Sequence, residues 1–360
     1  MRLYSGRTTL SKFLIEHCHG SEQQRQLAAL LIDVAAAVKA IASVVGKGEL
    51  GGSHGMAGAV NVQGEEQHRL DILANELLIE HCDWSGLVAG MVSEENEDPI
   101  AIDAQLPRGQ QLLVFDPLDG SSNIEVNVAV GTIFSVLRHE RESAPATEDF
   151  LQPGVRQVAA GYAIYGPATM LVLTIGQGTH GFTLDRDIGN FVLTHPGMSI
   201  APDAREFAIN TSNERFWESP VKRYIAECKA GASGIRECDF NMRWTASMVA
   251  EVHRILMRGG VYMYPYDTRD VTRAGRLRLL YEANPAAFIV EQAGGAASTG
   301  RARILDMQPT ALHQRVPLLF GSRNEIERIE RYHAEFAAGV DKPYASPLFG
   351  ERSLFRLEAE

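Results

Sequence analysis

Three short apolar segments of this chain run directly into carboxylates, and this arrangement limits the folds that the chain can adopt. The segments and the acids that follow them are 87–93 with Glu94 and Glu95, 111–115 with Asp116 and Asp119, and 277–281 with Glu282. Each segment has the length and composition of a strand, and strand ends gather at one edge of a sheet, where loops and ligands meet. Converging carboxylates repel one another and are costly to bury unpaired. A divalent cation would relieve that repulsion, although a solvated loop charge is the commoner role for any single acid.

The segment 115–123, Phe-Asp-Pro-Leu-Asp-Gly-Ser-Ser-Asn, combines two kinds of ligand group. Asp116 and Asp119 offer the hard oxygen atoms that Mg²⁺ and Mn²⁺ prefer. Gly120, Ser121 and Ser122 offer backbone N–H and hydroxyl groups that can hold a phosphate. Because metal and phosphate ligands stand side by side, the motif indicates phosphate-ester chemistry, and a purely solvated turn is the weaker interpretation here.

Composition and charge exclude several classes of protein. The chain has 360 residues, of which 45% are hydrophobic, enough for two domains or one large one. A net charge of −11 without any basic run argues against a nucleic-acid partner. No apolar run approaches the length of a membrane span, and the first 14 residues lack the apolar core of a signal peptide. The cysteines form no CxxC pair, so we predict a cytoplasmic protein without a zinc site; they are Cys18, Cys82, Cys228 and Cys238.

Helical and extended patterns alternate along the chain, with no internal repeat. We predict helices at 21–45, at 67–81, at 245–257 and from an N-cap at Asn284 to residue 293. We predict further strands at 126–137, 155–165, 169–175 and 261–264. Loops are expected at 46–64 and 143–153. Proline and glycine become frequent near 194–203. We place a boundary there, between an N-terminal domain of residues 1–196 and a C-terminal domain of residues 197–360.

An anionic substrate needs cationic side chains and hydrogen-bond donors to offset the negative field. The candidates are Arg243, Tyr264, Arg276 and Arg278. Arg276 and Arg278 alternate along the predicted strand, so both can face one side, with a solvated strand edge as the competing interpretation. Asp71 lies near a helix start, where a favourable charge at the helix dipole is its simplest role and orientation of a metal-bound water is the alternative. The histidines His68, His139, His253 and His313 show no ligand spacing, and we interpret them as structural or surface residues.

Several separated motifs resemble one known family. Asp71 and the segments 92–95 and 116–122 are similar to the Mg²⁺-dependent, lithium-sensitive sugar and inositol phosphatases. Longer stretches narrow the resemblance to class I fructose-1,6-bisphosphatase, from about the first helix to His313-Gln314-Arg315; they are 61–64, 119–134, 159–166, 247–254 and 275–285. The resemblance implies an α/β fold layered α/β/α/β/α, with two sheets.

The same resemblance implies an activity. A metal-activated water would hydrolyse the 1-phosphate of fructose 1,6-bisphosphate and yield fructose 6-phosphate and phosphate. The reaction would belong to gluconeogenesis or the Calvin cycle. The implied cofactor is Mg²⁺, with Mn²⁺ as an alternative. The implied metal ligands are Glu94, Glu95, Asp116, the carbonyl of Leu118, Asp119 and Glu282. The residues implied to act on the water are Asp71 and Glu95. The reacting phosphate would be held by Gly120, Ser121, Ser122 and Arg278. The sugar and the 6-phosphate would be contacted by Asn210, Arg243, Tyr264 and Arg276. In the family the residue at the Arg243 position reaches a neighbouring subunit, so a homotetramer is expected, with no nucleic-acid or membrane partner.

Four positions depart from the family pattern and leave the substrate open. Glu65 stands where an aspartate is usual, Trp244 and Asn213 stand where tyrosines occur, and Arg276 replaces a lysine. The rival substrate is sedoheptulose 1,7-bisphosphate, alone or in addition. A rival of another class is a catalytically silent sugar-phosphate sensor, which the complete set of carboxylates disfavours. An inositol monophosphatase would leave the C-terminal matches unexplained.

Two regulatory features of relatives are missing from the sequence. Members inhibited by AMP resemble one another in a Thr-Gly-Glu-Leu-Thr segment at the start of the first long helix, where this chain has Gln-Arg-Gln-Leu-Ala at 24–28. Their Lys-Tyr pair is Gln110-Gln111 here, and only Arg138 remains at a matching position. Plastid members carry a cysteine-bearing insertion, whereas the loop at 141–153 has no cysteine. We therefore expect little AMP inhibition and no thiol control.

Overall fold

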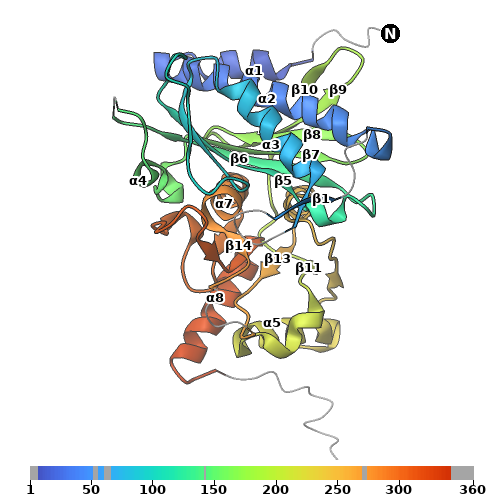
Figure 1. Ribbon diagram of the computed structural model, residues 1–360. Coiled ribbons are helices and arrows are strands. Elements are labelled where there is room, and N and C mark those ends of the chain that lie inside the picture. The colour runs from blue at the N-terminus through green and yellow to red at the C-terminus, as the bar shows by residue number, and fades with distance from the viewer. Residues whose placement is uncertain (1–6, 52–55, 61–65, 142, 270–273, 342–360) are drawn as a thin grey trace, which may run out of the picture.

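The protein folds into five layers in which helices and sheets alternate (Figure 1). The computed structural model describes residues 7–51, 56–60, 66–141, 143–269 and 274–341. From the top of Figure 1 downward, the layers are helices α1 to α3, an eight-stranded sheet, helices α6 and α7, a five-stranded sheet, and helices α5 and α8. This arrangement confirms the layered α/β/α/β/α fold that the resemblance implied.

The helices of the described chain differ widely in length. They are α1 (Leu10–His17), α2 (Glu22–Val45), α3 (Arg69–Cys82), α4 (Thr147–Phe150), α5 (Ser219–Ala230), α6 (Met248–Arg258), α7 (Asn284–Gln292) and α8 (Arg323–Ala337). Serine side chains cap two of them: Ser21 Oγ accepts a hydrogen bond from the Gln24 N–H at the start of α2, and Ser247 Oγ accepts one from the Ala250 N–H at the start of α6. Both serines satisfy backbone donors that a helix leaves unpaired at its N-terminus.

The eight-stranded sheet brings two acidic segments to one edge. Its order is β10 (Asn190–Met198), β9 (Thr179–Asp185), β8 (Thr169–Thr174), β7 (Ala159–Tyr165), β6 (Val130–Arg138), β5 (Gln111–Asp119), β3 (Val88–Ser93) and β4 (Ile100–Ala101). Strands β3 and β5 are parallel, with Ser93 paired to Phe115, whereas the other neighbours are antiparallel. Parallel strands end at the same edge of a sheet, so Glu94 lies beside Asp116.

The second sheet is smaller and mixed. Its order is β12 (Asn241–Met242), β11 (Glu206–Ala208), β13 (Val261–Tyr264), β17 (Leu318–Gly321) and β15 (Ala296–Ser298). Two short antiparallel ribbons complete the described strands: β1 (Met56–Val60) with β2 (Glu66–His68), and β14 (Leu277–Arg278) with β16 (Arg315–Val316). The predicted domain division at 196/197 stays a prediction, and strand β10 continues across it to Met198.

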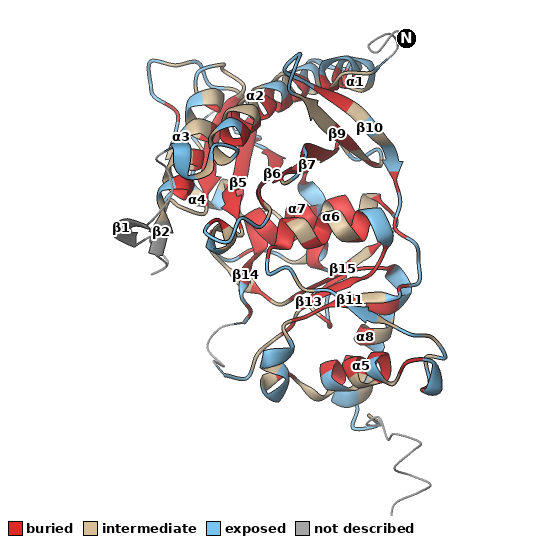
Figure 2. Ribbon diagram, turned by 90° about the vertical axis from the view of Figure 1, so that its right-hand side faces the viewer, coloured by how far each residue is buried: buried red, intermediate tan, exposed pale blue. Residues whose placement is uncertain are grey.

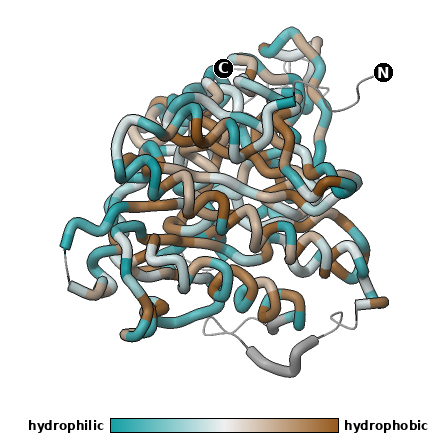
Figure 3. Tube along the Cα trace, turned by 90° about the horizontal axis from the view of Figure 1, so that it is seen from above, coloured by the Kyte–Doolittle hydropathy of each residue, from teal (hydrophilic) through white to brown (hydrophobic). Residues whose placement is uncertain are grey.

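Apolar cores lie between successive layers. One joins α1, α2 and α3 to the larger sheet, a second surrounds α6 and α7 between the sheets, and a third lies under α5 and α8. Figure 2 shows α6 and α7 between the two sheets, with their buried faces in red. Seen from above in Figure 3, hydrophobic and hydrophilic stretches alternate along helices, as expected where one helix face is buried.

Helix α2 corrects the expectation about membrane-length segments. By length and composition alone this helix of 24 residues is apolar enough to cross a membrane, although half of its apolar window is buried within the protein. Its residues Leu30, Val34 and Val38 have no exposed surface and belong to the core above the larger sheet. The helix is apolar because it packs against other helices and the sheet.

Several predicted boundaries of helices, strands and loops were wrong. Strand β5 continues through Asp116 to Asp119. The segment expected to be a strand at 277–281 is extended only over β14, and a π-helical turn, Leu279–Ala283, then leads into α7. Asn284 is therefore already helical and is no N-cap. The predicted loop at 143–153 contains α4, whose Phe150 is fully buried, and the predicted loop at 46–64 contains β1.

Candidate active site

A cavity of about 320 Å³ opens where the two halves of the chain meet. The end of β5, the start of α3, the turn before α6 and the turn before α7 all contribute to its walls. Its lining residues are His68, Asp71, Glu94, Glu95, Asp116, Leu118, Asp119, Gly120, Ser121, Ser122, Trp244, Ala246, Met248, Tyr262, Tyr264, Leu277, Arg278 and Glu282. The cavity thus gathers the predicted metal ligands, the predicted water-acting residues and the Gly-Ser-Ser turn.

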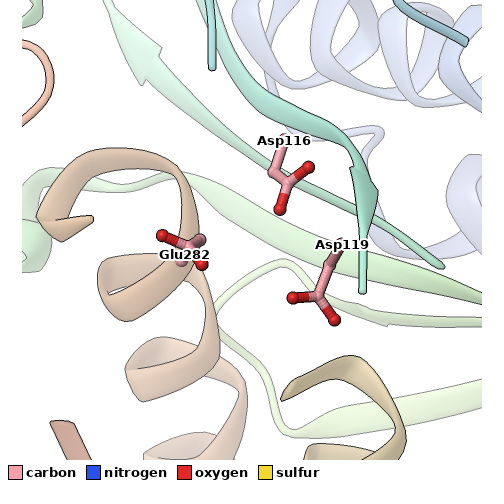
Figure 4. A group of neighbouring side chains, drawn as sticks. All are labelled: Asp116, Asp119 and Glu282. Carbon is pink, nitrogen blue, oxygen red and sulfur yellow. The ribbon is translucent and has the colours of Figure 1, made fainter. Parts of the chain in front are cut away.

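Three buried carboxylates, shown in Figure 4, lie together in the wall of this cavity. Asp116 and Asp119 come from β5 and Glu282 from the turn before α7, and one oxygen of each lies within 4.8 Å of the other two. Burial, together with the neighbouring carboxylates, raises the pKa of Glu282 to about 8 and that of Asp116 well above its usual value. Burial also raises the pKa of Asp119 to about 6. Each group would ionise more readily beside a cation.

Hydrogen bonds hold these three carboxylates in place. Asp116 Oδ1 accepts from the Leu118 N–H at 2.9 Å, and Glu282 Oε2 accepts from the Arg278 N–H at 2.5 Å. Asp119 Oδ2 accepts from the Val249 N–H at 2.8 Å and from Ser247 Oγ at 3.3 Å, so this carboxylate also caps α6. Fixed, buried, mutually repelling carboxylate oxygens are suited to hold a hard divalent cation.

Glu94 and Glu95 follow β3 and extend the acidic wall of the cavity. Arg278 Nη1 lies 3.2 Å from Glu94 Oε1, with both side chains largely buried. The backbone N–H of Glu95 donates to Ser93 Oγ at 3.2 Å. Arg278 therefore ties an acid from the N-terminal half to the turn that carries Glu282 in the C-terminal half.

Asp71 occupies the first turn of α3, and only 4% of its surface is exposed. Its Oδ2 accepts from the His68 N–H at 2.8 Å, while its buried Oδ1 has no hydrogen-bond partner among the described residues. Burial raises the pKa of Asp71 to about 7, against the lowering effect of the His68 N–H and with a further increase from Glu95. A buried oxygen without a partner next to an acidic cavity suits a bound water or cation.

The Gly-Ser-Ser turn depends on backbone conformations that favour glycine. Gly120 has φ +78°, and a Cβ atom there would lie 3.0 Å from the side chain of Ser247. A 3₁₀ turn, Ser121–Asn123, follows, and Asn123 Nδ2 donates to the Ala246 carbonyl at 3.0 Å. The turn is thereby held against the segment that precedes α6.

Three predicted substrate contacts lie outside this cavity. Asn210 lines a small neighbouring hollow together with Asn213, and Trp244 and Tyr264 border both spaces. Arg243 has half of its side chain exposed, with its Nε 3.6 Å from Glu206 Oε1. Arg276 is exposed and directly precedes β14. The predictions at 61–65, including Glu65, lie outside the described residues.

Sequence reasoning missed several residues of the site. Met248 of α6 and Tyr262 of β13 line the cavity, and Ser247, which caps α6, donates a hydrogen bond to Asp119. The backbone N–H of His68 donates to Asp71. The rings of Trp244 and Tyr262 stack with an interplanar angle of 3° and a centroid distance of 5.9 Å. A serine before an apolar helix is a recognisable N-cap signal, but nothing in its position indicates that it also bonds to Asp119.

Comparisons with known proteins agree with this geometry. The family model described as "Fructose-1-6-bisphosphatase, N-terminal domain" matches residues 8–196, and "Fructose-1-6-bisphosphatase, C-terminal domain" matches residues 200–334. The structure of Leishmania major fructose-1,6-bisphosphatase in holo form is similar, with 38% sequence identity and a TM-score of 0.85. The match covers 91% of this chain and 99% of that one. The two family matches together span most of the sequence, and the chain therefore belongs to the fructose-1,6-bisphosphatase family.

Proposed function

We propose that this protein is a phosphoric monoester hydrolase that removes the 1-phosphate of fructose 1,6-bisphosphate. The observation that carries the proposal is that three buried carboxylates and the Gly-Ser-Ser turn line the same cavity. Family membership and the likeness to the Leishmania enzyme support this substrate. The products are fructose 6-phosphate and inorganic phosphate.

A divalent cation is part of the proposed chemistry, with Mg²⁺ as the first choice and Mn²⁺ as the alternative. Asp116, Asp119 and Glu282 would hold it, together with Glu94, Glu95 and the carbonyl of Leu118, all of which line the cavity. When bound, such a cation polarises phosphoryl oxygens and lowers the pKa of water. The protein supplies fixed oxygen ligands and a largely water-excluded wall, since Asp116 and Glu282 are at most 3% exposed.

The remaining groups position the reactants. Asp71 and Glu95 are proposed to orient the attacking water and take up its proton, for which a pKa of about 7 suits Asp71. Gly120, Ser121 and Ser122 would hold the reacting phosphate through N–H and hydroxyl donors, with the Arg278 guanidinium as a nearby positive charge. Phosphoryl transfer depends mainly on positioning and on neutralising charge, which these groups provide.

The sugar end of the substrate is assigned to the side of the cavity that adjoins the neighbouring hollow, since the hollow itself, at about 10 Å³, is too small for a sugar phosphate. Asn210, Tyr264 and Arg276 are proposed contacts of the sugar and the 6-phosphate, and Trp244 and Tyr264 border both spaces. The exposed Arg243 is proposed to serve a neighbouring subunit of a homotetramer. Asn213 and Trp244, at this end of the site, are the reason for keeping sedoheptulose 1,7-bisphosphate as a second candidate substrate.

Phosphate release tests this assignment. The purified protein is assayed with each bisphosphate in excess Mg²⁺ and in excess EDTA, beside Asp119→Asn and the exposed control Asp187→Asn. We expect Mg²⁺-dependent release from fructose 1,6-bisphosphate, loss of turnover by orders of magnitude in Asp119→Asn, and normal activity in Asp187→Asn. Activity in EDTA, or an active Asp119→Asn, would contradict the metal assignment. Phosphate release from sedoheptulose 1,7-bisphosphate alone would make that compound the substrate in place of fructose 1,6-bisphosphate.

A further inference from the structure

We propose that Asn75 is a positioning residue for the acidic turn that carries Glu94 and Glu95, and that it thereby sets the metal affinity of the site. Asn75 is not among the residues that line the cavity, so its proposed role is indirect. It acts through Ser93 and Asn96, which stand on either side of the two glutamates. Because the cation belongs to the proposed function, the experiment below separates the failure of one from the failure of the other.

Helix α3 places Asn75 one turn beyond Asp71. Residues four apart in a helix lie on the same face, so this face carries both Asp71, which reaches the cavity, and Asn75, which reaches the acidic turn. The position of Glu95 relative to Asp71 therefore depends on how the turn is fastened to α3. These two are the residues proposed to act on the attacking water.

The amide of Asn75 fastens the turn at both ends. Its Oδ1 accepts a hydrogen bond from Ser93 Oγ at 2.7 Å, and its Nδ2 donates to Asn96 Oδ1 at 3.0 Å. Ser93 Oγ, having donated its proton to Asn75, accepts from the Glu95 N–H at 3.2 Å. A planar amide offers an acceptor and donors on one rigid group. Asn75 therefore directs the Ser93 hydroxyl toward the backbone of a proposed metal ligand.

Burial makes this network hard to replace by water. Ser93 has no exposed surface, and Asn75 and Asn96 are half-buried. On the side facing the larger sheet, the Glu94 N–H donates to the Phe115 carbonyl at 3.1 Å, which fixes the turn to β5. On the other side, His313 Nε2 lies 3.3 Å from the Glu97 carbonyl oxygen. Asn75 joins the turn to α3 through two side-chain hydrogen bonds, and their loss would loosen the two glutamates relative to Asp71.

The effect of removing such a partner is selective. Groups that hold metal ligands by hydrogen bonds typically affect metal affinity or activity by about tenfold to a hundredfold. Asn75→Leu keeps the branching at Cγ but removes both hydrogen bonds, and Ser93→Ala removes the acceptor of the Glu95 N–H. Glu76→Ala, at the next position on α3 and exposed, is the matched control.

The test measures metal binding without substrate. Thermal midpoints of wild type, Asn75→Leu, Ser93→Ala, the double variant and Glu76→Ala are recorded as Mn²⁺ alone is titrated into EDTA-treated protein. We expect the Mn²⁺ concentration for half-maximal stabilisation to rise about tenfold or more in both single variants, with no change in Glu76→Ala. The double variant should resemble the worse single variant, because both changes break one network. With fructose 1,6-bisphosphate, kcat should fall by a similar factor while KM stays nearly constant.

Two results would overturn the assignment. One is a lower midpoint in EDTA with an unchanged Mn²⁺ dependence, which would make Asn75 merely structural. The other is full additivity in the double variant, which would mean that the two residues act separately. Should Asn75→Leu fail to fold, Ser93→Ala decides on the same readout. If wild type releases no phosphate yet the Mn²⁺ dependence shifts as expected, the proposed function fails and the positioning role stands.

Discussion

Removing the charge of Glu282 should stabilise the metal-free protein at alkaline pH while abolishing its activity. Glu282 lies within 4.8 Å of two other buried carboxylates, Asp116 and Asp119. At that separation and an effective dielectric constant of about 20, each ionised pair repels by roughly 3 kcal/mol. Glu282→Gln eliminates two of the three pairs, and the amide oxygen can still accept the hydrogen bond from the Arg278 N–H.

The pH dependence follows from the direction of the shift. The pKa of Glu282 is about 8 in the folded protein, against a usual value near 4.5. Between these values the folded state holds a proton that the unfolded state has released, so stability falls as pH rises, by about 1.4 kcal/mol per pH unit for one proton. Above about pH 8 the free energy of unfolding shows no further decrease from this group. The gain from Glu282→Gln should therefore be small near pH 5 and amount to a few kcal/mol at pH 8.5.

Thermal unfolding in EDTA at pH 5.5, 7 and 8.5 measures this, with Glu80→Gln, an exposed residue of α3, as control. We expect the midpoint of wild type and of the control to fall with pH and that of Glu282→Gln to fall less. Mg²⁺ should raise the midpoint of wild type at pH 8.5 and hardly affect Glu282→Gln. The reasoning is refuted if EDTA-treated wild type is as stable at pH 8.5 as at pH 5.5, or if Glu282→Gln is the less stable protein at pH 8.5.

Three further outcomes are expected. Arg243→Ala should raise KM much more than it changes kcat. Mixing this variant with Asp119→Asn should restore some activity, because a hybrid oligomer can contain an intact site. No recovery of activity despite proven subunit exchange would contradict a shared site. Dithiothreitol and mild oxidation should leave activity nearly equal, since the loop at 141–153 has no cysteine and Cys18, Cys82 and Cys228 are buried free thiols; a large, reversible activation by reductant would count against this. AMP should inhibit little at concentrations that silence typical animal members, because Arg138 Nη1 already donates to Gln23 Oε1 at 2.9 Å and the Ser21 side chain caps the N-terminus of α2; cooperative inhibition in the micromolar range would refute it.

Local patterns were enough to predict the parts of the site that lie close together in the chain. The spacing of Asp116, Asp119 and the Gly-Ser-Ser turn predicted a metal and phosphate site, and the structure places all of them in one cavity. The first long helix began at its predicted cap, Ser21, because the cap and the apolar pattern are both local signals. The layered fold came from the family resemblance, which rests on many separated motifs in one order.

Only the tertiary structure decided how distant segments complete the site. The apolar run before Glu282 has the composition of a strand, but its pairing with β16 covers just two residues, and the chain then turns into a helix. Asp119 caps a helix 130 residues further along the chain, and Asn75 reaches across 18 residues to Ser93. Such bonds depend on the packing of whole layers against one another. A single sequence records the hydrogen-bonding groups themselves, whereas the fold alone determines which donor meets which acceptor.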